Sequence, residues 1–189
     1  MIARKLVSLN SVLGTFARKI QIEFAFSLAY SYLCTCKDTQ KMEINLPPYD
    51  IKMREQGGKR QIFDFLRRKY VALTPEEWVR QHFTHWLVGH KGYPQALLGN
   101  EIELTVGEKK LRCDSILYNK ELQPRMILEY KAPSIALTQK VFNQISTYNL
   151  LLHVDYLVVS NGLQHYCCRM DYEQHTYHFL QDIPDYSDL

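Results

Sequence analysis

The chain has no long apolar run. No stretch approaches the roughly 20 uncharged residues that a membrane-spanning helix needs, so a helical membrane protein is not expected. A glycine-rich phosphate loop of the form G-x-x-x-x-G-K-[ST] is also missing, so these 189 residues give no sign of a nucleotide-driven motor. Neither sign of charge is in large excess, because 23 Lys and Arg face 20 Asp and Glu. Charge alone therefore does not indicate a nucleic-acid binder.

Cysteine spacing excludes the common zinc sites. The five cysteines are odd in number and contain no C-x-x-C pair: Cys34, Cys36, Cys113, Cys167 and Cys168. We therefore expect free thiols and a reducing, cytoplasmic location.

Residues 1–41 differ from the rest of the chain. They hold six Lys or Arg against two acidic residues, and they lack turn signals and convincing helix caps. We favour a native start at Met42, which leaves a single domain over residues 42–189. The alternatives are a dispensable helical extension and a transit-like segment, since residues 1–20 are acid-free and contain Ser and Arg.

The segment after Met42 opens with a Pro-rich entry and a Gly-Gly turn, and we expect one short strand at 62–66. Residues 52–69 hold seven Lys or Arg against Glu55 and Asp64. This basic stretch is either a phosphate-contacting surface or a solvated charged face.

A helix is predicted next. Thr74 suits the N-cap, Pro75 the first helical position, and Glu77 completes a capping box. The pattern ends at the glycines near residue 90. Its histidines (His82, His85 and His90) are expected to be partly exposed or interfacial rather than metal ligands.

The remaining pattern predicts a mixed sheet with helices. Alternation and turn residues indicate strands at 101–106, 111–119 and 125–132. Apolar residues at helical spacing predict a helix at 134–154, and a fully apolar run predicts a strand at 155–162. One or two further strands are expected in 163–180. The fold class is therefore α/β, with a mixed central sheet flanked by helices.

Charged residues interrupt the apolar stretch "ILEYKAP". Strand alternation places Ile127, Glu129 and Lys131 on one face, and the short connection at 119–124 brings Asp114 of the preceding strand within reach. An ordinary ion pair is one interpretation, and such pairs contribute little. However, burying these charges is costly unless something compensates. Two carboxylates and a backbone carbonyl are hard oxygen ligands for Mg²⁺, and a neighbouring lysine can orient and help deprotonate a water that attacks a phosphodiester.

The spacing from Asp114 to Glu129-Tyr130-Lys131 resembles the PD-(D/E)XK nuclease signature. The surrounding residues, from about Leu73 to Tyr166, resemble the N-terminal nuclease domain of type I restriction enzyme R subunits. The shared features are Ala132-Pro133 after the lysine, a Q-x-x-x-Y motif at Gln144 and Tyr148, and the strand ending in Asn161-Gly162.

The resemblance implies a restriction-endonuclease-like fold and assigns roles. Asp114 and Glu129, with the Tyr130 carbonyl, would bind Mg²⁺ or Mn²⁺, and Lys131 would position the attacking water. Gln144 and Tyr148 would act near the site or on the DNA backbone, although Tyr148 also fits the apolar stripe of its helix. Glu77 is a further candidate ligand, or only a capping residue.

The implied function is a Mg²⁺-dependent DNA endonuclease domain. Cys113 stands where the signature's name expects proline, a departure that the family tolerates. Because no motor motif is present, we expect a stand-alone domain or one that works with separate motor or specificity subunits. The alternative is a catalytically idle DNA-binding or assembly module with the same fold.

Overall fold

A computed structural model describes residues 42–106 and 109–189, and Met42–Leu189 forms one compact unit. The predictions for residues 1–41 lie outside the described residues. None of the helices within the described ranges is long and apolar enough to cross a membrane.

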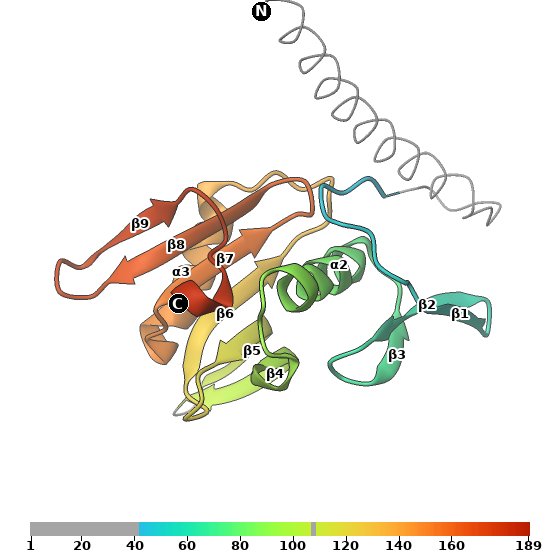
Figure 1. Ribbon diagram of the computed structural model, residues 1–189, viewed down its shortest axis with the longest axis horizontal. Helices are drawn as coiled ribbons and strands as arrows, with labels where there is room; N and C mark the ends of the chain where they lie inside the picture. Colours follow the sequence, from blue (N-terminus) through green and yellow to red (C-terminus); the bar gives the residue numbers. More distant parts are fainter. Residues whose placement is uncertain (1–41, 107–108) are drawn as a thin grey trace, which may run out of the picture. The chain divides into compact units, whose positions relative to one another are not determined.

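A six-stranded mixed sheet forms the centre of this unit (Figure 1). Its strands follow one another across the sheet in chain order: β4 Leu98–Val106, β5 Lys109–Tyr118, β6 Pro124–Tyr130, β7 Tyr156–Ser160, β8 His165–Asp171 and β9 Thr176–Leu180. Only β6 and β7 are parallel, and α3, Gln139–Leu152, makes the crossover between them. Parallel neighbours need such a crossover.

Helices cover the two faces of the sheet. α2, Pro75–His90, packs Val79, Phe83 and Leu87 on one face, against a cluster that includes Leu128 and Val158. α3 packs on the opposite face, in the cluster that holds Val141, Ile145, Ile127 and Leu157. Successive residues of β6 and β7 therefore enter different cores, which explains why both strands are apolar throughout. The predicted mixed sheet flanked by helices is confirmed.

The helix starts depend on local chemistry. Thr74 caps α2, because its Oγ1 accepts a hydrogen bond from the Glu77 N–H at 3.0 Å, as the sequence predicts. The predicted start of the second helix at Ser134 is wrong, since α3 begins at Gln139. Residues 132–135 instead form a turn, in which the Ile135 N–H donates to the Ala132 carbonyl at 2.9 Å.

A second, three-stranded antiparallel sheet precedes α2. It contains β1 Met53–Gln56, β2 Lys59–Asp64 and β3 Lys69–Ala72. Gly57 and Gly58 form its first turn at φ 59° and 69°, a conformation that glycine adopts without strain. The prediction of one strand at 62–66 is wrong in number and bounds. Leu66 lies in the second turn, where its N–H bonds to Asp64 Oδ1 at 2.9 Å.

A short 3₁₀ turn, Gln95–Leu97, leads into β4, and another, Tyr186–Asp188, ends the chain.

Candidate active site

Asp114 lies where β5 and β6 separate. The ladder between these strands runs from Tyr118 to the pair Ser115 and Leu128. Beyond that pair, Asp114 Oδ2 accepts a hydrogen bond from the Tyr130 N–H at 2.8 Å. A side-chain carboxylate thus bonds a backbone donor next to Glu129, which fixes the position of Asp114.

Glu129 connects β6 to α3. Its side chain is buried, with the residue 4% exposed, and its Oε1 lies 2.7 Å from both Lys131 Nζ and Gln144 Nε2. The structure therefore brings together Glu129, Lys131 and Gln144, residues that the sequence singles out. Tyr148 is more peripheral, because its hydroxyl lies 3.5 Å from Gln144 Nε2 while its ring packs beside the α3 core.

Negative charge accumulates at this position. Burial, reinforced by the charge of Asp114, raises the pKa of Glu129, although Lys131 opposes the shift. Burial and the charge of Asp114 likewise raise the pKa of Glu76. Burial disfavours the charged form of Lys131, but its hydrogen bond and ion pair with Glu129 outweigh burial and raise its pKa. Lys131 is therefore an ammonium ion at neutral pH, a hydrogen-bond donor rather than a ready proton acceptor.

Arg80 is the main residue that our sequence analysis missed. It is 3% exposed, and its Nη2 lies 2.8 Å from Asp114 Oδ1 and 2.7 Å from Glu101 Oε1. Its Nη1 pairs with Glu77. Glu101 reaches Arg80 from a left-handed backbone position, φ 55°, where the pairing of β4 with β5 is interrupted. Such strained backbone is typical of functional sites.

A signal for Arg80 exists in the sequence. It stands three and four residues after two glutamates on the predicted helix, so all three share one helical face with the apolar contacts of α2. Its partners on β4 and β5 depend on the tertiary fold.

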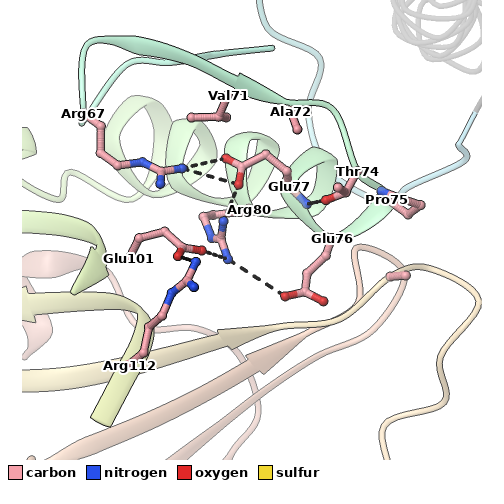
Figure 2. A pocket seen from close by; sticks show the side chains of 11 residues that line it. Arg67, Val71, Ala72, Thr74, Pro75, Glu76, Glu77, Arg80, Glu101 and Arg112 are labelled. Carbon is pink, nitrogen blue, oxygen red and sulfur yellow. Dashed lines mark hydrogen bonds and ion pairs between the residues drawn. The ribbon is translucent and has the colours of Figure 1, made fainter. Parts of the chain in front are cut away.

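A cavity of about 540 Å³ opens beside these residues (Figure 2). It is lined by Arg67, Val71, Ala72, Thr74, Pro75, Glu76, Glu77, Arg80, Glu101, Arg112 and Ala132. Glu76 and Glu77, which both line this cavity, differ in their contacts. Glu77 is buried and bonds Arg67, Arg80 and Gln81, whereas Glu76 lies 3.9 Å from Arg80 Nη2. Glu76 thus pairs with Arg80 only at this longer distance, and its carboxylate lies within the field of Asp114 and Lys131.

The donor chemistry fits Mg²⁺. Within residues 42–106 and 109–189, no group of three His, Cys, Asp or Glu side chains is arranged to hold a metal ion. However, Mg²⁺ typically takes one or two protein carboxylates and completes its shell with water and substrate phosphate. Asp114 and Glu129 are hard oxygen donors whose negative charges already disfavour one another. The backbone carbonyl of Tyr130, the residue after Glu129, is a third oxygen donor next to them in the chain.

The Asn161-Gly162 motif has a structural part. Asn161 Nδ2 donates to the Ile135 carbonyl at 2.9 Å, and its Oδ1 accepts from the N–H groups of Leu163 and Gln164. The motif therefore anchors the turn that follows Lys131, and so supports the site from the end of β7.

Residues 75–184 match the family model described as type I restriction enzyme R protein N terminus. No curated protein sequence matches the chain.

Two solved structures are similar over part of the chain. One is a fragment described as an HsdR subunit of a type I restriction enzyme from Vibrio vulnificus YJ016, at 18% identity and a TM-score of 0.45, covering 59% of this chain and 24% of that chain. The other is a cryoEM structure of a DrdV–DNA complex, at 17% identity and a TM-score of 0.35, covering 58% and 11%. The matched region thus spans less than a quarter of either structure's chain.

Proposed function

Because the chain belongs to the type I restriction enzyme R protein N-terminus family, we propose that it is a Mg²⁺-dependent DNA endonuclease domain. It would hydrolyse phosphodiester bonds. The observation that carries this proposal is the juxtaposition of Asp114, Glu129 and Lys131 at the separation of β5 and β6, where Lys131 Nζ lies 2.7 Å from Glu129.

Each residue has a role that follows from its contacts. Asp114 and Glu129, with the Tyr130 carbonyl, would hold Mg²⁺, which when bound supplies Lewis acidity and favours a hydroxide nucleophile. Lys131, a cation in this setting, would orient the attacking water and stabilise negative charge on the phosphate. Gln144 would hold the Glu129 carboxylate in place through its amide, which lies 2.7 Å away. Tyr148 would support Gln144 from the next helical turn.

Activity on DNA tests the proposal directly. Purified protein is incubated with linear, circular and branched DNA and with Mg²⁺ or Mn²⁺, beside Lys131→Ala and Asp114→Asn. We expect cleavage by the wild type and its loss in both variants. Lys140→Ala, an exposed lysine at the start of α3, is the matched control and should cleave normally. Cleavage that survives in Lys131→Ala would contradict the assignment.

A second function is favoured by one specific observation. Asp114 is paired with Arg80, and Glu129 with Lys131, so the carboxylates are compensated by the protein's own cations. In a catalytically idle DNA-binding or assembly module, these ion pairs would be enough to stabilise the buried carboxylates, and no metal ion would be needed. The idle module predicts DNA binding without cleavage on every substrate and with either metal, and no effect of Glu129→Ala on binding.

We propose a cytoplasmic location for the protein. The cysteines of the described ranges, Cys113, Cys167 and Cys168, are free and buried, which agrees with a reducing compartment. Separate motor or specificity subunits are the proposed protein partners, and co-purification with a tagged chain would test them.

A further inference from the structure

One face of the three-stranded sheet carries cations and no carboxylate. Strand alternation places Arg54 of β1 and Lys59 of β2 on this face, with Lys52 just before β1, and all three side chains are exposed. Glu55 and Asp64, the acidic residues of the sheet, point to the opposite side. We call the side that bears Lys52, Arg54 and Lys59 the basic face.

Two cations of the basic face, Lys52 and Arg54, lie over aromatic rings, and no carboxylate in the described part of the chain neutralises them. No carboxylate within the described ranges forms an ion pair with any of the three. The Arg54 guanidinium lies 4.2 Å from the Tyr70 ring centroid, and its Nε donates to Gln61 Oε1 at 2.7 Å. Lys52 Nζ lies 5.9 Å from the Phe63 ring centroid. The rings support the cations and leave their charge available.

The same sheet borders the candidate active site. Val71 and Ala72 of β3 line the cavity, and Arg67, from the turn before β3, bonds Glu77 on α2 (Figure 2). Residues 53–72 precede the region that matches the family, which begins at residue 75. The sheet that bears the basic face is therefore an element beside the cavity that the family match does not include.

We propose that the basic face binds the phosphate backbone of duplex DNA on one side of the scissile bond. This inference rests on the proposed function, because it assumes that the DNA is the substrate of the neighbouring site. Exposed, unpaired Lys and Arg bind phosphates and release counterions. The chemistry favours a duplex over a stacked single strand, since Phe63 and Tyr70 are half-buried beneath cations and cannot offer free ring faces.

The salt dependence of DNA binding tests the contact between the basic face and DNA phosphates. Fluorescence anisotropy of a labelled 30-base-pair duplex is followed from 50 to 300 mM KCl in EDTA, which prevents metal-dependent cleavage. The double variant Arg54→Gln/Lys59→Gln should weaken binding at least threefold. It should also reduce the slope of log K against log salt by about 1.8, because each phosphate contact contributes about 0.9. Lys120→Gln/Arg169→Gln, which removes two exposed cations from the β5–β6 turn and from β8, should leave the slope unchanged.

A gain of charge gives an independent test that does not depend on removing contacts. Gln56→Lys adds an exposed cation to the basic face and should tighten binding and steepen the slope. Gln174→Lys, in an exposed turn after β8, is its control. Circular dichroism confirms that each variant is folded.

The outcomes separate the two proposals. Wild-type affinity and slope in the double variant would overturn the basic-face contact while leaving cleavage by the wild type as evidence for the endonuclease. If the wild type never cleaves DNA but the double variant has the reduced salt slope, the contact would be supported and the endonuclease proposal overturned. Absence of DNA binding by the wild type, or preferential binding to phosphatidylserine vesicles, would overturn the contact.

Discussion

Arg80 and Asp114 form a buried ion pair that joins α2 to the sheet, with 2.8 Å between Nη2 and Oδ1. The same nitrogen lies 2.7 Å from Glu101. Burial disfavours the Arg80 charge, yet Asp114 and Glu77 outweigh burial and raise its pKa. The guanidinium therefore remains charged and holds carboxylates from α2, β4 and β5 in fixed positions.

Replacing Arg80 with Met should destabilise the protein by about 3–5 kcal/mol, because it leaves buried carboxylates without a cation. Arg80→Lys keeps the charge but not the planar guanidinium that bonds several carboxylates at once, so we expect an intermediate loss of stability. Urea unfolding measures both. Arg112→Met is the control, since Arg112 pairs with Glu101 from an exposed position and should change stability by less than about 1 kcal/mol. Equal losses for Arg80→Met and Arg112→Met would contradict this ranking.

Glu76 and Glu77 should respond differently to the same isosteric change. Glu77→Gln should lower stability by about 1–3 kcal/mol, because Glu77 is buried and bonds two arginines. Glu76→Gln should leave stability nearly unchanged and instead alter Mn²⁺ affinity, measured by calorimetry, because its carboxylate shares the field of Asp114. The reverse pattern would show that Glu77 is the acidic residue of α2 that serves the site.

Gln144 should act through Glu129. Gln144→Ala removes the donor 2.7 Å from Glu129 Oε1, so we expect Mn²⁺ affinity and cleavage to fall by about 10–100-fold, the effect usual for residues that orient ligands. Asn143→Ala changes the neighbouring exposed residue of α3 and should leave both unchanged. Tyr148→Phe keeps the packed ring and removes a hydroxyl whose contact with Gln144 is long, so its effect should be below threefold. A larger effect of Tyr148→Phe would give the hydroxyl its own role.

Acid should destabilise the protein through His82. The sequence-based expectation of a partly exposed or interfacial side chain is wrong for this residue, which is 4% exposed and hydrogen-bonded through Nδ1 to the Trp78 carbonyl at 2.8 Å. Burial lowers the pKa of His82 to about 4 from its ordinary 6.5. Between these values the unfolded chain binds more protons than the folded one, so the free energy of unfolding falls as the pH is lowered.

The His82 contribution should be on the order of 2 kcal/mol across that window. His82→Asn retains a donor in place of Nδ1 and should lose less stability than the wild type between pH 7.5 and 5 in urea unfolding. His90→Asn, at an exposed position, is the control. Parallel pH curves for the wild type and His82→Asn would refute the assignment.

Gly162 should tolerate no side chain. Its φ is 83°, and a Cβ would lie 2.7 Å from Ile44 Cγ2 and 3.0 Å from Val79 Cγ2. Gly162→Ala should therefore cost about 2–4 kcal/mol, from backbone strain and overpacking together. Gly92→Ala has a similar φ of 70° but open space around the Cβ, and should cost only about 1 kcal/mol. Thermal unfolding compares them, and equal losses would exclude the packing contribution.

The sequence by itself determined the features that depend on short-range pattern. Thr74 and Pro75 specify the start of α2, alternating patterns specify β4 and β5, and continuous apolar runs specify β6 and β7. The spacing of Asp114, Glu129 and Lys131 indicates that these charges share one location, because strand alternation and a short turn leave few other arrangements.

Only the tertiary structure decided which side chains complete the site. Arg80 and Glu76 approach Asp114 from α2 and Glu101 approaches from β4, and their directions depend on how α2 and the left-handed residue in β4 pack against β5. The late start of α3 depends on Asn161, which is more than twenty residues away and holds the Ile135 carbonyl. Likewise, the charges of residues 52–69 become one surface only through the pairing of β1, β2 and β3, since cross-strand register sets the face each cation occupies.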